Sequence, residues 1–254
     1  MKNNQMKKLL VFISPLLLLM IHLPFVFART AHAHTSGKPI SAFVSERKVE
    51  NAASGHTGYQ FIYEQLNLQA LGLSEDAFNY ALKGFNKLVE NGKVRKDDLL
   101  SIVDFTKPSS QKRLFVIDLK NSRVLFNTYV AHGQGSGEKF ARHFSNIPES
   151  YQSSLGFYIT SDTYIGKNGY SMYLTGMEKG INDKAESRAI VMHGAPYVHE
   201  SYIRSQGYIG RSWGCPAVPE KLNRPIIETI KGGSCLFLYS NNKNYLSHSN
   251  ILNS

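Results

Sequence analysis

Cysteine is scarce in this chain of 254 residues, which contains only Cys215 and Cys235. Two cysteines are too few for the disulfide framework that stabilises small secreted domains. In an oxidising compartment they could form one structural disulfide, but Cys235 begins the apolar run of residues 235–239, where a small buried side chain explains it equally well. The chain is long enough for one sizeable hydrophobic core and a small accessory region, so the fold does not require cross-links.

Long runs of basic residues are also absent, although Lys and Arg outnumber Asp and Glu by 29 to 19. Residues 1–33 carry four of the basic residues and no acidic ones, so the remaining 25 basic and 19 acidic residues leave a net charge of +6. Scattered positive charge of this size suits an anionic cell-envelope surface and gives little support to nucleic-acid binding. Zinc-site patterns such as H-E-x-x-H and paired cysteines are missing as well, and the sequence shows no internal repeat.

The N-terminus has the order of residues that is typical of a secretory signal peptide. Three lysines within the first eight residues precede an apolar run over residues 9–27, and small-residue cleavage motifs follow. An uncleaved membrane anchor is the alternative, but Pro15 and Pro24 interrupt the run and no second apolar span follows. We therefore predict a signal peptide over residues 1–33, export to the periplasm or cell envelope, and a soluble mature protein whose oligomeric state the sequence leaves open.

The rest of the chain divides by composition. Residues 34–58 lack periodicity and are predicted to be a linker, and residues 59–105 are predicted to form an N-terminal helical segment. Its clearest helix has Ser74 as N-cap and Gly92 at its end, with apolar residues at helical spacing between them. A main domain is predicted over residues 106–240 and a loose polar tail over residues 241–254.

The main domain is rich in short apolar runs that are typical of strands. Many short strands separated by Gly/Ser turns, with little helix, predict a mainly β fold, either a sandwich or a barrel. The predicted strands are residues 113–119, 124–131, 155–160, 171–174, 188–193 and 235–239, with a hairpin turn at 120–123 and a short helix at 225–230.

One stretch, G-R-S-W-G-C-P-A-V over residues 210–218, carries the candidate chemistry. Cys215 lies between a glycine and a proline, and His193 ends a separate apolar run and precedes Gly194. A thiol is a poor nucleophile until it is ionised, and a nearby imidazole can form a thiolate–imidazolium pair with it. We predict Cys215 as nucleophile and His193 as its general base.

The residues around Cys215 suit an oxyanion-binding pocket and the walls of a site. Gly214 allows a close backbone approach, and the N–H groups of residues 213–215 are the candidate oxyanion donors. Ser212, Trp213 and Gly194 are predicted to line the site. A buried structural thiol is the alternative for Cys215, and a histidine satisfied at a strand end is the alternative for His193.

Two other enzyme classes can be matched less well. Residues 210–214 fit the G-x-S-x-G nucleophile elbow of serine hydrolases, but the only later histidine is His248, in the tail. A zinc hydrolase using His132, His143, His193 and Cys215 lacks the usual ligand spacing.

These motifs resemble those of the L,D-transpeptidase (YkuD-like) catalytic domains, enzymes that remodel bacterial peptidoglycan. The family has His followed by Gly or Ser and, further along, Ser-His-Gly-Cys; here Cys215 follows His193 by 22 positions. The closest resemblance is to a divergent murein L,D-transpeptidase subgroup whose motif reads Gly-Arg-Ser-x-Gly-Cys-Pro-Ala. Trp213 replaces the family's second histidine, and Pro216-Ala217 replaces an apolar residue followed by Arg or Asn. The resemblance also covers residues 144–146, 153–158 and 168–171, Asn182 and Arg188.

The resemblance implies acyl transfer without a metal or an organic cofactor. The Cys215 thiolate would attack the L-centred third residue of a peptidoglycan tetrapeptide stem, releasing D-Ala and leaving a thioester, and carbapenems would acylate the same cysteine. An amine of a second stem would then form a 3–3 cross-link, whereas water would make the enzyme an L,D-carboxypeptidase. Arg211, Tyr170 and Ser171 are the predicted substrate contacts. A non-catalytic envelope-binding module and a cysteine peptidase for ordinary proteins remain as alternatives.

Overall fold

The computed structural model describes residues 58–253. The predicted signal peptide and nearly all of the predicted linker lie outside these residues. Within them, no helix has the length and hydropathy needed to cross a membrane. Three helices open the described part of the chain: α2 (Gly58–Gln65), α3 (Leu68–Leu71) and α4 (Glu75–Glu90).

The predicted helix after Ser74 is present as α4 and begins with the predicted cap. The Ser74 hydroxyl accepts a hydrogen bond from the N–H of Ala77 at 3.3 Å, which satisfies one of the free amides of the first turn. Glu75 and Asp76 lie in that turn, where their charge is favourable beside the helix dipole. The apolar face of α4, including Phe78 and Phe85, is buried.

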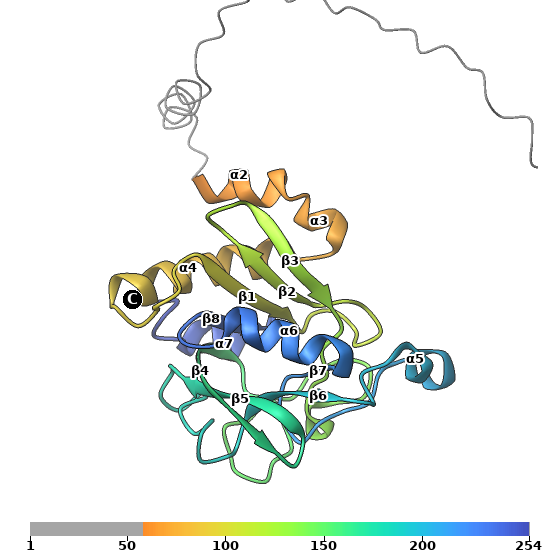
Figure 1. The fold of residues 1–254 in the computed structure, drawn as a ribbon. Helices are drawn as coiled ribbons and strands as arrows, with labels where there is room; N and C mark the ends of the chain where they lie inside the picture. Colours follow the sequence, from red (N-terminus) through yellow and green to blue (C-terminus); the bar gives the residue numbers. More distant parts are fainter. Residues whose placement is uncertain (1–57, 254) are drawn as a thin grey trace, which may run out of the picture. The chain divides into compact units, whose positions relative to one another are not determined.

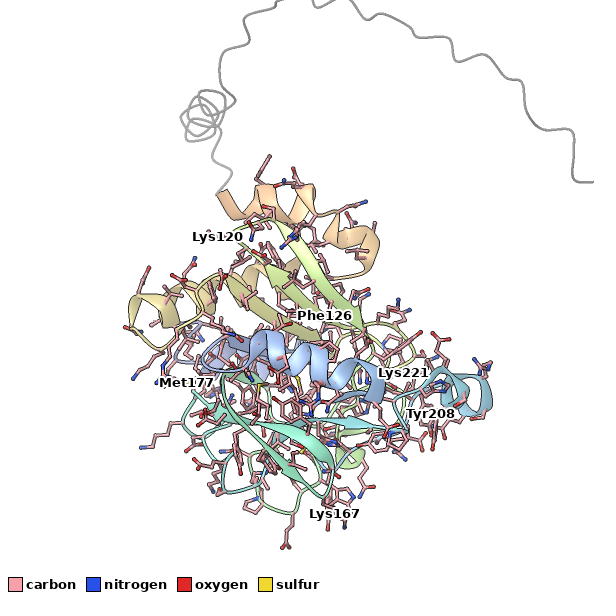
Figure 2. All side chains as sticks on the ribbon, in the orientation of Figure 1. Lys120, Phe126, Lys167, Met177, Tyr208 and Lys221 are labelled. Atoms are coloured by element: carbon pink, nitrogen blue, oxygen red, sulfur yellow. The ribbon has the colours of Figure 1, made fainter. Side chains whose placement is uncertain are left out.

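Eight strands form one sheet in the order β3-β2-β1-β8-β4-β5-β6-β7, which confirms the mainly β prediction (Figure 1). Neighbours are antiparallel except β1–β8 and β6–β7, which are parallel. Lys120 and Lys167 are exposed in the turns of the hairpins β2–β3 and β4–β5 (Figure 2). The strands are β1 (Leu99–Asp104), β2 (Leu114–Asp118), β3 (Arg123–Thr128), β4 (Gly156–Gly166), β5 (Gly169–Gly176), β6 (Val191–Ala195), β7 (Ala217–Pro219) and β8 (Cys235–Tyr239).

The two edges of this sheet meet, so that it is nearly closed into a barrel. Ala131, just beyond edge strand β3, forms an antiparallel bridge with Ala217 in the opposite edge strand β7. A second bridge joins Gly133 to Ser212, and the N–H of Ser212 donates to the carbonyl of His132 at 2.9 Å. The closing contact therefore consists of residues 131–134 and residues 212–217, which include the candidate cysteine.

Several elements are longer than the sequence predicted, or begin elsewhere. Strands β4 and β5 extend beyond the predicted segments because they pair with each other along most of their length. Strand β6 begins at Val191 rather than at residue 188, since Ala189 has φ of 53° and breaks the extended backbone. Helix α6 (Glu220–Ile230) begins before Pro225 and packs on β6, and η2 (Gln134–Ser136), α5 (Glu200–Gln206) and the strands β1 and β7 were not predicted. The helical prediction for residues 59–105 is wrong at its end, because residues 99–104 pair with β2 and β8 as a strand.

The polar tail was predicted to be loose, and this is wrong for the described part of it. Helix α7 (Lys243–His248) is capped by the Asn242 side chain, which accepts from the N–H of Tyr245. The Tyr245 hydroxyl donates to buried Glu178 at 3.1 Å, and Leu252 is fully buried. The polar composition of the tail did not predict these contacts, because burial of only a few side chains is enough to hold a short segment against the core.

The core lies between α4 and the centre of the sheet. The rings of Phe157 and Phe237, on adjacent strands β4 and β8, stack with centroids 4.1 Å apart. Gly84 of α4 lies directly over the Phe157 ring, because a Cβ at this position would be 2.0 Å from Cζ of that ring. The approach of α4 to the sheet therefore requires glycine at position 84.

Replacing Gly84 with alanine is expected to lower the free energy of unfolding by about 2 kcal/mol, since overpacking a core costs more than the gain in helix propensity. Thermal and denaturant unfolding would measure this, with Lys83→Ala as the control because Lys83 is exposed on the same helix. A Gly84→Ala variant as stable as the control would contradict the proposed contact with Phe157.

Candidate functional site

Cys215 lies in the turn that precedes strand β7, within the closing contact of the sheet. Its side chain is half-buried, and Sγ donates to the carbonyl oxygen of Ala189 at 3.6 Å. Burial raises the pKa of the Cys215 thiol, while the backbone N–H of Val191 and the charge of Arg188 lower that pKa. The sulfur is therefore next to the beginning of β6, the strand that carries His193.

His193 lies in β6, and the strand register places it close to Cys215. The Cα of His193 is paired with that of Ala217 in β7, and Cys215 comes two residues before Ala217. Val191, whose N–H faces the sulfur, comes two residues before His193, about 7 Å away along the strand. The nucleophile and base candidates thus lie in adjacent segments, the turn before β7 and strand β6.

The hydrogen bond of the His193 ring determines which nitrogen can accept a proton. Nδ1 lies 2.9 Å from the Gly194 carbonyl oxygen. A carbonyl can only accept, so Nδ1 carries the proton and Nε2 keeps its lone pair. Burial lowers the pKa of His193, although the bond to Gly194 opposes this effect. The imidazole is therefore neutral at neutral pH.

These pKa directions differ from the predicted thiolate–imidazolium pair. The pKa of Cys215 is raised and that of His193 is lowered, in both cases mainly by burial. Both shifts favour the neutral forms, a thiol beside an imidazole. The arrangement can therefore activate the thiol by proton transfer as it attacks, rather than by a stored ion pair.

The turn that holds Cys215 is organised by Ser212. The Ser212 hydroxyl donates to the Cys215 carbonyl at 2.7 Å and accepts from the N–H of Gly214 at 3.1 Å. The Gly214 N–H is thus occupied, and the N–H of Cys215 is directed at its own sulfur, where it lowers the pKa of the thiol. Gly214 has φ of 129°, a conformation that favours glycine, and a Cβ there would lie 2.9 Å from the Gln152 carbonyl.

Three other predicted wall or substrate residues surround this turn. Trp213 is 69% exposed, and its ring contacts that of Tyr151 edge-on, with centroids 5.8 Å apart. Gly194 accepts the His193 bond and has no room for a side chain, since a Cβ would be 2.9 Å from that of Asn223. Arg211 donates to the Gly137 carbonyl at 3.3 Å, so it connects the residues just before the Cys215 turn to the segment that follows residues 131–134.

The remaining two predicted substrate contacts differ in their surroundings. Ser171 is buried, and its Cα is paired with that of His193 in the β5–β6 register. Tyr170 is directed toward α6 instead: its hydroxyl bonds Glu228, and the Arg224 guanidinium lies 4.2 Å from its ring centroid. The structure brings Ser171 next to His193 and engages Tyr170 elsewhere.

Sequence reasoning missed the residues that surround the sulfur from outside the motif. Ala189 and Val191 contact it through the backbone, which no side-chain pattern could reveal. Arg188 and Tyr197 are also close to the thiol. Burial lowers the pKa of Arg188, and the charges of Tyr158 and Cys215 oppose this effect. Burial and the charge of Cys215 raise the pKa of Tyr197 to about 12. The resemblance covered Arg188 without giving it a role.

The alternative chemistries find less support. Cys215 and Cys235 are both free thiols, so the structural disulfide is not formed. His132 is buried, and its Nδ1 lies 2.6 Å from the Arg113 guanidinium; burial and that charge lower the pKa of His132 to about 3. Residues 58–253 contain no cluster of three His, Cys, Asp or Glu side chains placed to hold a metal ion. Ser212 uses its hydroxyl within the turn, which leaves it a supporting role.

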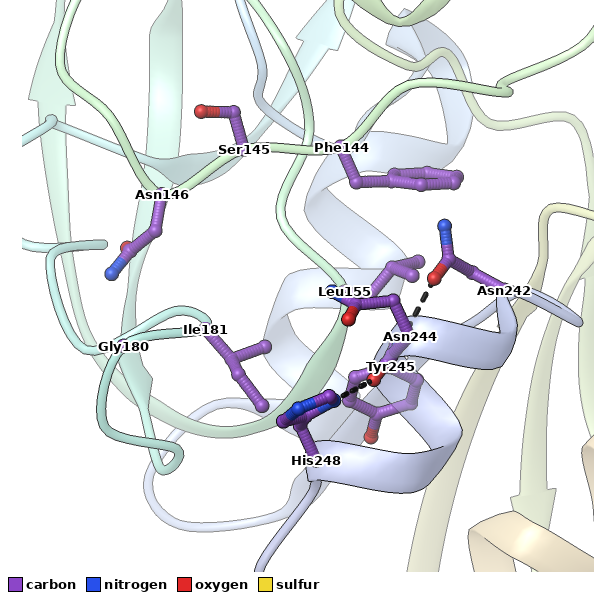
Figure 3. A pocket seen from close by; sticks show the side chains of 10 residues that line it. All are labelled: Phe144, Ser145, Asn146, Leu155, Gly180, Ile181, Asn242, Asn244, Tyr245 and His248. Carbon is purple, nitrogen blue, oxygen red and sulfur yellow. Dashed lines mark hydrogen bonds between the residues drawn. The ribbon is translucent and has the colours of Figure 1, made fainter.

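A pocket of about 150 Å³ lies away from the candidate residues, between α7 and the segment around residue 145 (Figure 3). The figure shows Phe144, Asn242 and His248 at its rim. Neither Cys215 nor His193 lines this pocket. This hollow is therefore separate from the candidate nucleophile and base.

Comparisons with known proteins give a family and several structural relatives. A family model, YkuD_2, the L,D-transpeptidase catalytic domain, matches residues 69–239. An L,D-transpeptidase from Mycobacterium smegmatis is 13% identical with a TM-score of 0.35, and the match covers 56% of this chain and 59% of that one. The helical cell shape determining protein Pgp2 from Campylobacter jejuni is 14% identical with a TM-score of 0.38, covering 57% and 48%. L,D-transpeptidase 3 from Mycobacterium tuberculosis is 12% identical with a TM-score of 0.35, covering 56% and 61%.

The chain spans 59% of the length of the Mycobacterium smegmatis structure and less of Pgp2. The curated proteins contain no match.

Proposed function

Since the chain belongs to the family of L,D-transpeptidase catalytic domains, we propose that it is a cysteine acyltransferase that acts on the stem peptides of peptidoglycan. The thiol of Cys215 is its nucleophile and His193 is its general base. The reaction needs no metal and no organic cofactor. The acceptor is an amine of a second stem, which gives a 3–3 cross-link.

One observation carries this proposal: the turn that holds the Cys215 thiol leads directly into β7, the strand that pairs with β6 at His193. The bond from Nδ1 of His193 to Gly194 directs the lone pair of Nε2 away from that carbonyl. The register with β7 keeps Cys215 within two residues of the partner of His193. Such a pair is the arrangement that a cysteine nucleophile requires.

The first half of the reaction forms a thioester. The Cys215 sulfur attacks the carbonyl carbon of the L-centred third residue as Nε2 of His193 takes the thiol proton. The N–H groups of Cys215 and Trp213 donate to the oxyanion of the tetrahedral intermediate. The C–N bond then breaks, and the imidazolium returns the proton to the amine of the departing D-Ala.

The second half transfers the acyl group. An amine of a second stem attacks the thioester carbonyl and gives its proton to His193, and the sulfur leaves and is reprotonated. Attack by water in place of the amine would yield a tripeptide stem, which is the L,D-carboxypeptidase outcome. The exposed side chain of Trp213, two residues before Cys215, provides apolar surface for a second stem peptide.

Such a reaction requires that the protein reach the cell wall. We therefore propose that residues 1–33 are a signal peptide and that the protein is located in the periplasm or cell envelope. The N-terminal sequence supports this, because basic residues are followed by an apolar run and then by small residues. The net positive charge of the remaining chain suits an anionic envelope.

Incubation of the purified protein with sacculi, followed by muramidase digestion and mass analysis of the fragments, tests the function. Cross-linked dimers of two stems joined through their third residues are expected, and Cys215→Ala should produce none. Tripeptide stems without dimers would assign the carboxypeptidase reaction instead. Unchanged fragments would indicate a non-catalytic wall-binding module, and cleavage of all-L peptides would indicate a peptidase.

A further inference from the structure

Arg188 lies in the turn before β6 and connects the Cys215 turn to the segment of residues 145–154, which we call the 145–154 loop. Its guanidinium donates four hydrogen bonds to this loop, all to uncharged acceptors. Nη1 bonds the Ser145 carbonyl at 2.7 Å and the Ser154 hydroxyl at 2.5 Å. Nη2 bonds the Gln152 carbonyl at 2.7 Å and the Ser150 hydroxyl at 3.3 Å. Four bonds of a planar fork to one loop hold that loop in a single position.

The charge of Arg188 is not neutralised by any carboxylate in the described part of the chain, where the ion pairs involve other residues. The guanidinium also lies against the Cys215 turn, since a Cβ on Gly214 would be 3.5 Å from its Nη2. It opposes the effect of burial on the thiol, because it lowers the pKa of Cys215. A lasting positive charge therefore faces the sulfur.

The other titratable groups around the sulfur are neutral. Tyr197, which follows β6, has its pKa raised to about 12 by burial and by the charge of Cys215. His193 is neutral because burial lowers its pKa. Arg188 is thus the cation among the groups described around the thiol.

The same guanidinium fixes the residue that contacts Trp213. Ser150 and Gln152, both bonded to Nη2, flank Tyr151, which has φ of 54°. This left-handed conformation is unfavourable for a bulky side chain and persists only where the surroundings impose it. Held in this way, the Tyr151 ring contacts that of Trp213 beside the thiol.

We propose that Arg188 is a positioning residue of the Cys215 site with two effects. Its charge stabilises the thiolate form of Cys215, and its four hydrogen bonds hold the 145–154 loop so that Tyr151 packs on Trp213. The importance of this residue for acyl transfer rests on the proposed function. Its effect on the thiol does not, because an ionised sulfur reacts with any small electrophile.

Alkylation of the full chain by iodoacetamide, followed by mass spectrometry and measured over a range of pH, tests the charge effect. Arg188→Gln is expected to lower the rate at Cys215 about tenfold at pH 7 and to move its rise to higher pH, since an opposite charge favours the ionised thiol. Arg188→Lys keeps the charge and should stay within about threefold of the native rate. Lys184→Gln, which removes an exposed charge from the same turn, should leave the profile unchanged.

Trp213 is the only tryptophan of the chain, so its fluorescence tests the second effect. Quenching by acrylamide should increase in both Arg188 variants, because neither keeps all four bonds of the fork, while circular dichroism shows that both remain folded. An Arg188→Gln variant with the native alkylation profile, or an Arg188→Lys variant as slow as Arg188→Gln, would overturn the charge effect. Unchanged quenching would overturn the loop effect. If Cys215 of the unmodified protein is alkylated as expected but the protein does not cross-link sacculi, the proposed function is rejected and the charge effect of Arg188 stands.

Discussion

Replacing Cys215 with alanine is expected to abolish the covalent adduct that the protein forms with a carbapenem. The adduct requires a thiol that can lose its proton, and Cys215 is half-buried two residues before Ala217, which is paired with His193 in the β6–β7 register. Ser212 cannot substitute for it, because the Ser212 hydroxyl is used within the turn. Mass spectrometry of the intact protein after incubation with the carbapenem should show one added molecule for the native chain and none for the variant.

The second cysteine provides the matched control. Cys235 is fully buried in β8, and burial raises its pKa, so its thiol is neither accessible nor ionised. Cys235→Ala is therefore expected to keep the full adduct and to lower the unfolding temperature slightly, because it leaves a small void. If Cys235→Ala lost the adduct and Cys215→Ala kept it, the assignment of the nucleophile would be wrong.

Replacing His193 with glutamine is expected to slow acylation by about 10²- to 10⁴-fold, the usual contribution of a general base. Glutamine preserves a side chain that can hydrogen-bond the Gly194 carbonyl, as Nδ1 of His193 does at 2.9 Å, but it cannot accept a proton. The time course of adduct formation by mass spectrometry would measure the rate. His143→Gln serves as the control, since the His143 side chain is exposed and makes no hydrogen bond with Cys215 or His193.

The pH dependence distinguishes loss of the base from a distorted site. Burial lowers the pKa of His193, so in the native protein the neutral base is available at neutral pH and is lost only as the pH falls through that lowered value. Without the base, the rate should follow ionisation of the thiol, whose pKa burial raises, and should keep rising with pH. A variant with the native pH profile at a uniformly lower rate would show that His193 acts through structure alone.

Local sequence patterns predicted the elements that depend on neighbouring residues. The helix after Ser74 was predicted from its cap and its apolar spacing, and α4 has both. The strands predicted over residues 113–119 and 124–131, joined by a hairpin turn, correspond to β2 (114–118) and β3 (123–128). Such patterns succeed because helix caps and hairpin turns are formed by residues close in sequence.

The boundaries that failed depend on contacts between distant segments. Strand β4 is longer than predicted because β5 and β8 pair with it on either side. Helix α7 in the tail is held by Glu178 and the core, which no pattern within the tail records. Pairing partners and burial are decided by the whole fold, so composition alone misjudges both.

At the candidate site, too, residue identity was predictable from the sequence and the arrangement of the residues was not. Residue type and position in the sequence by themselves determined that Cys215 and His193 are the candidates, because few side chains of a chain with two cysteines can act as nucleophile and base. Only the tertiary structure decided that β6 and β7 pair next to Cys215, that the Ser212 hydroxyl occupies the N–H of Gly214, and that Arg188 faces the sulfur. The physical reason is that register, desolvation and charge at a site arise where distant segments meet, here where Ala131 and Ala217 close the sheet.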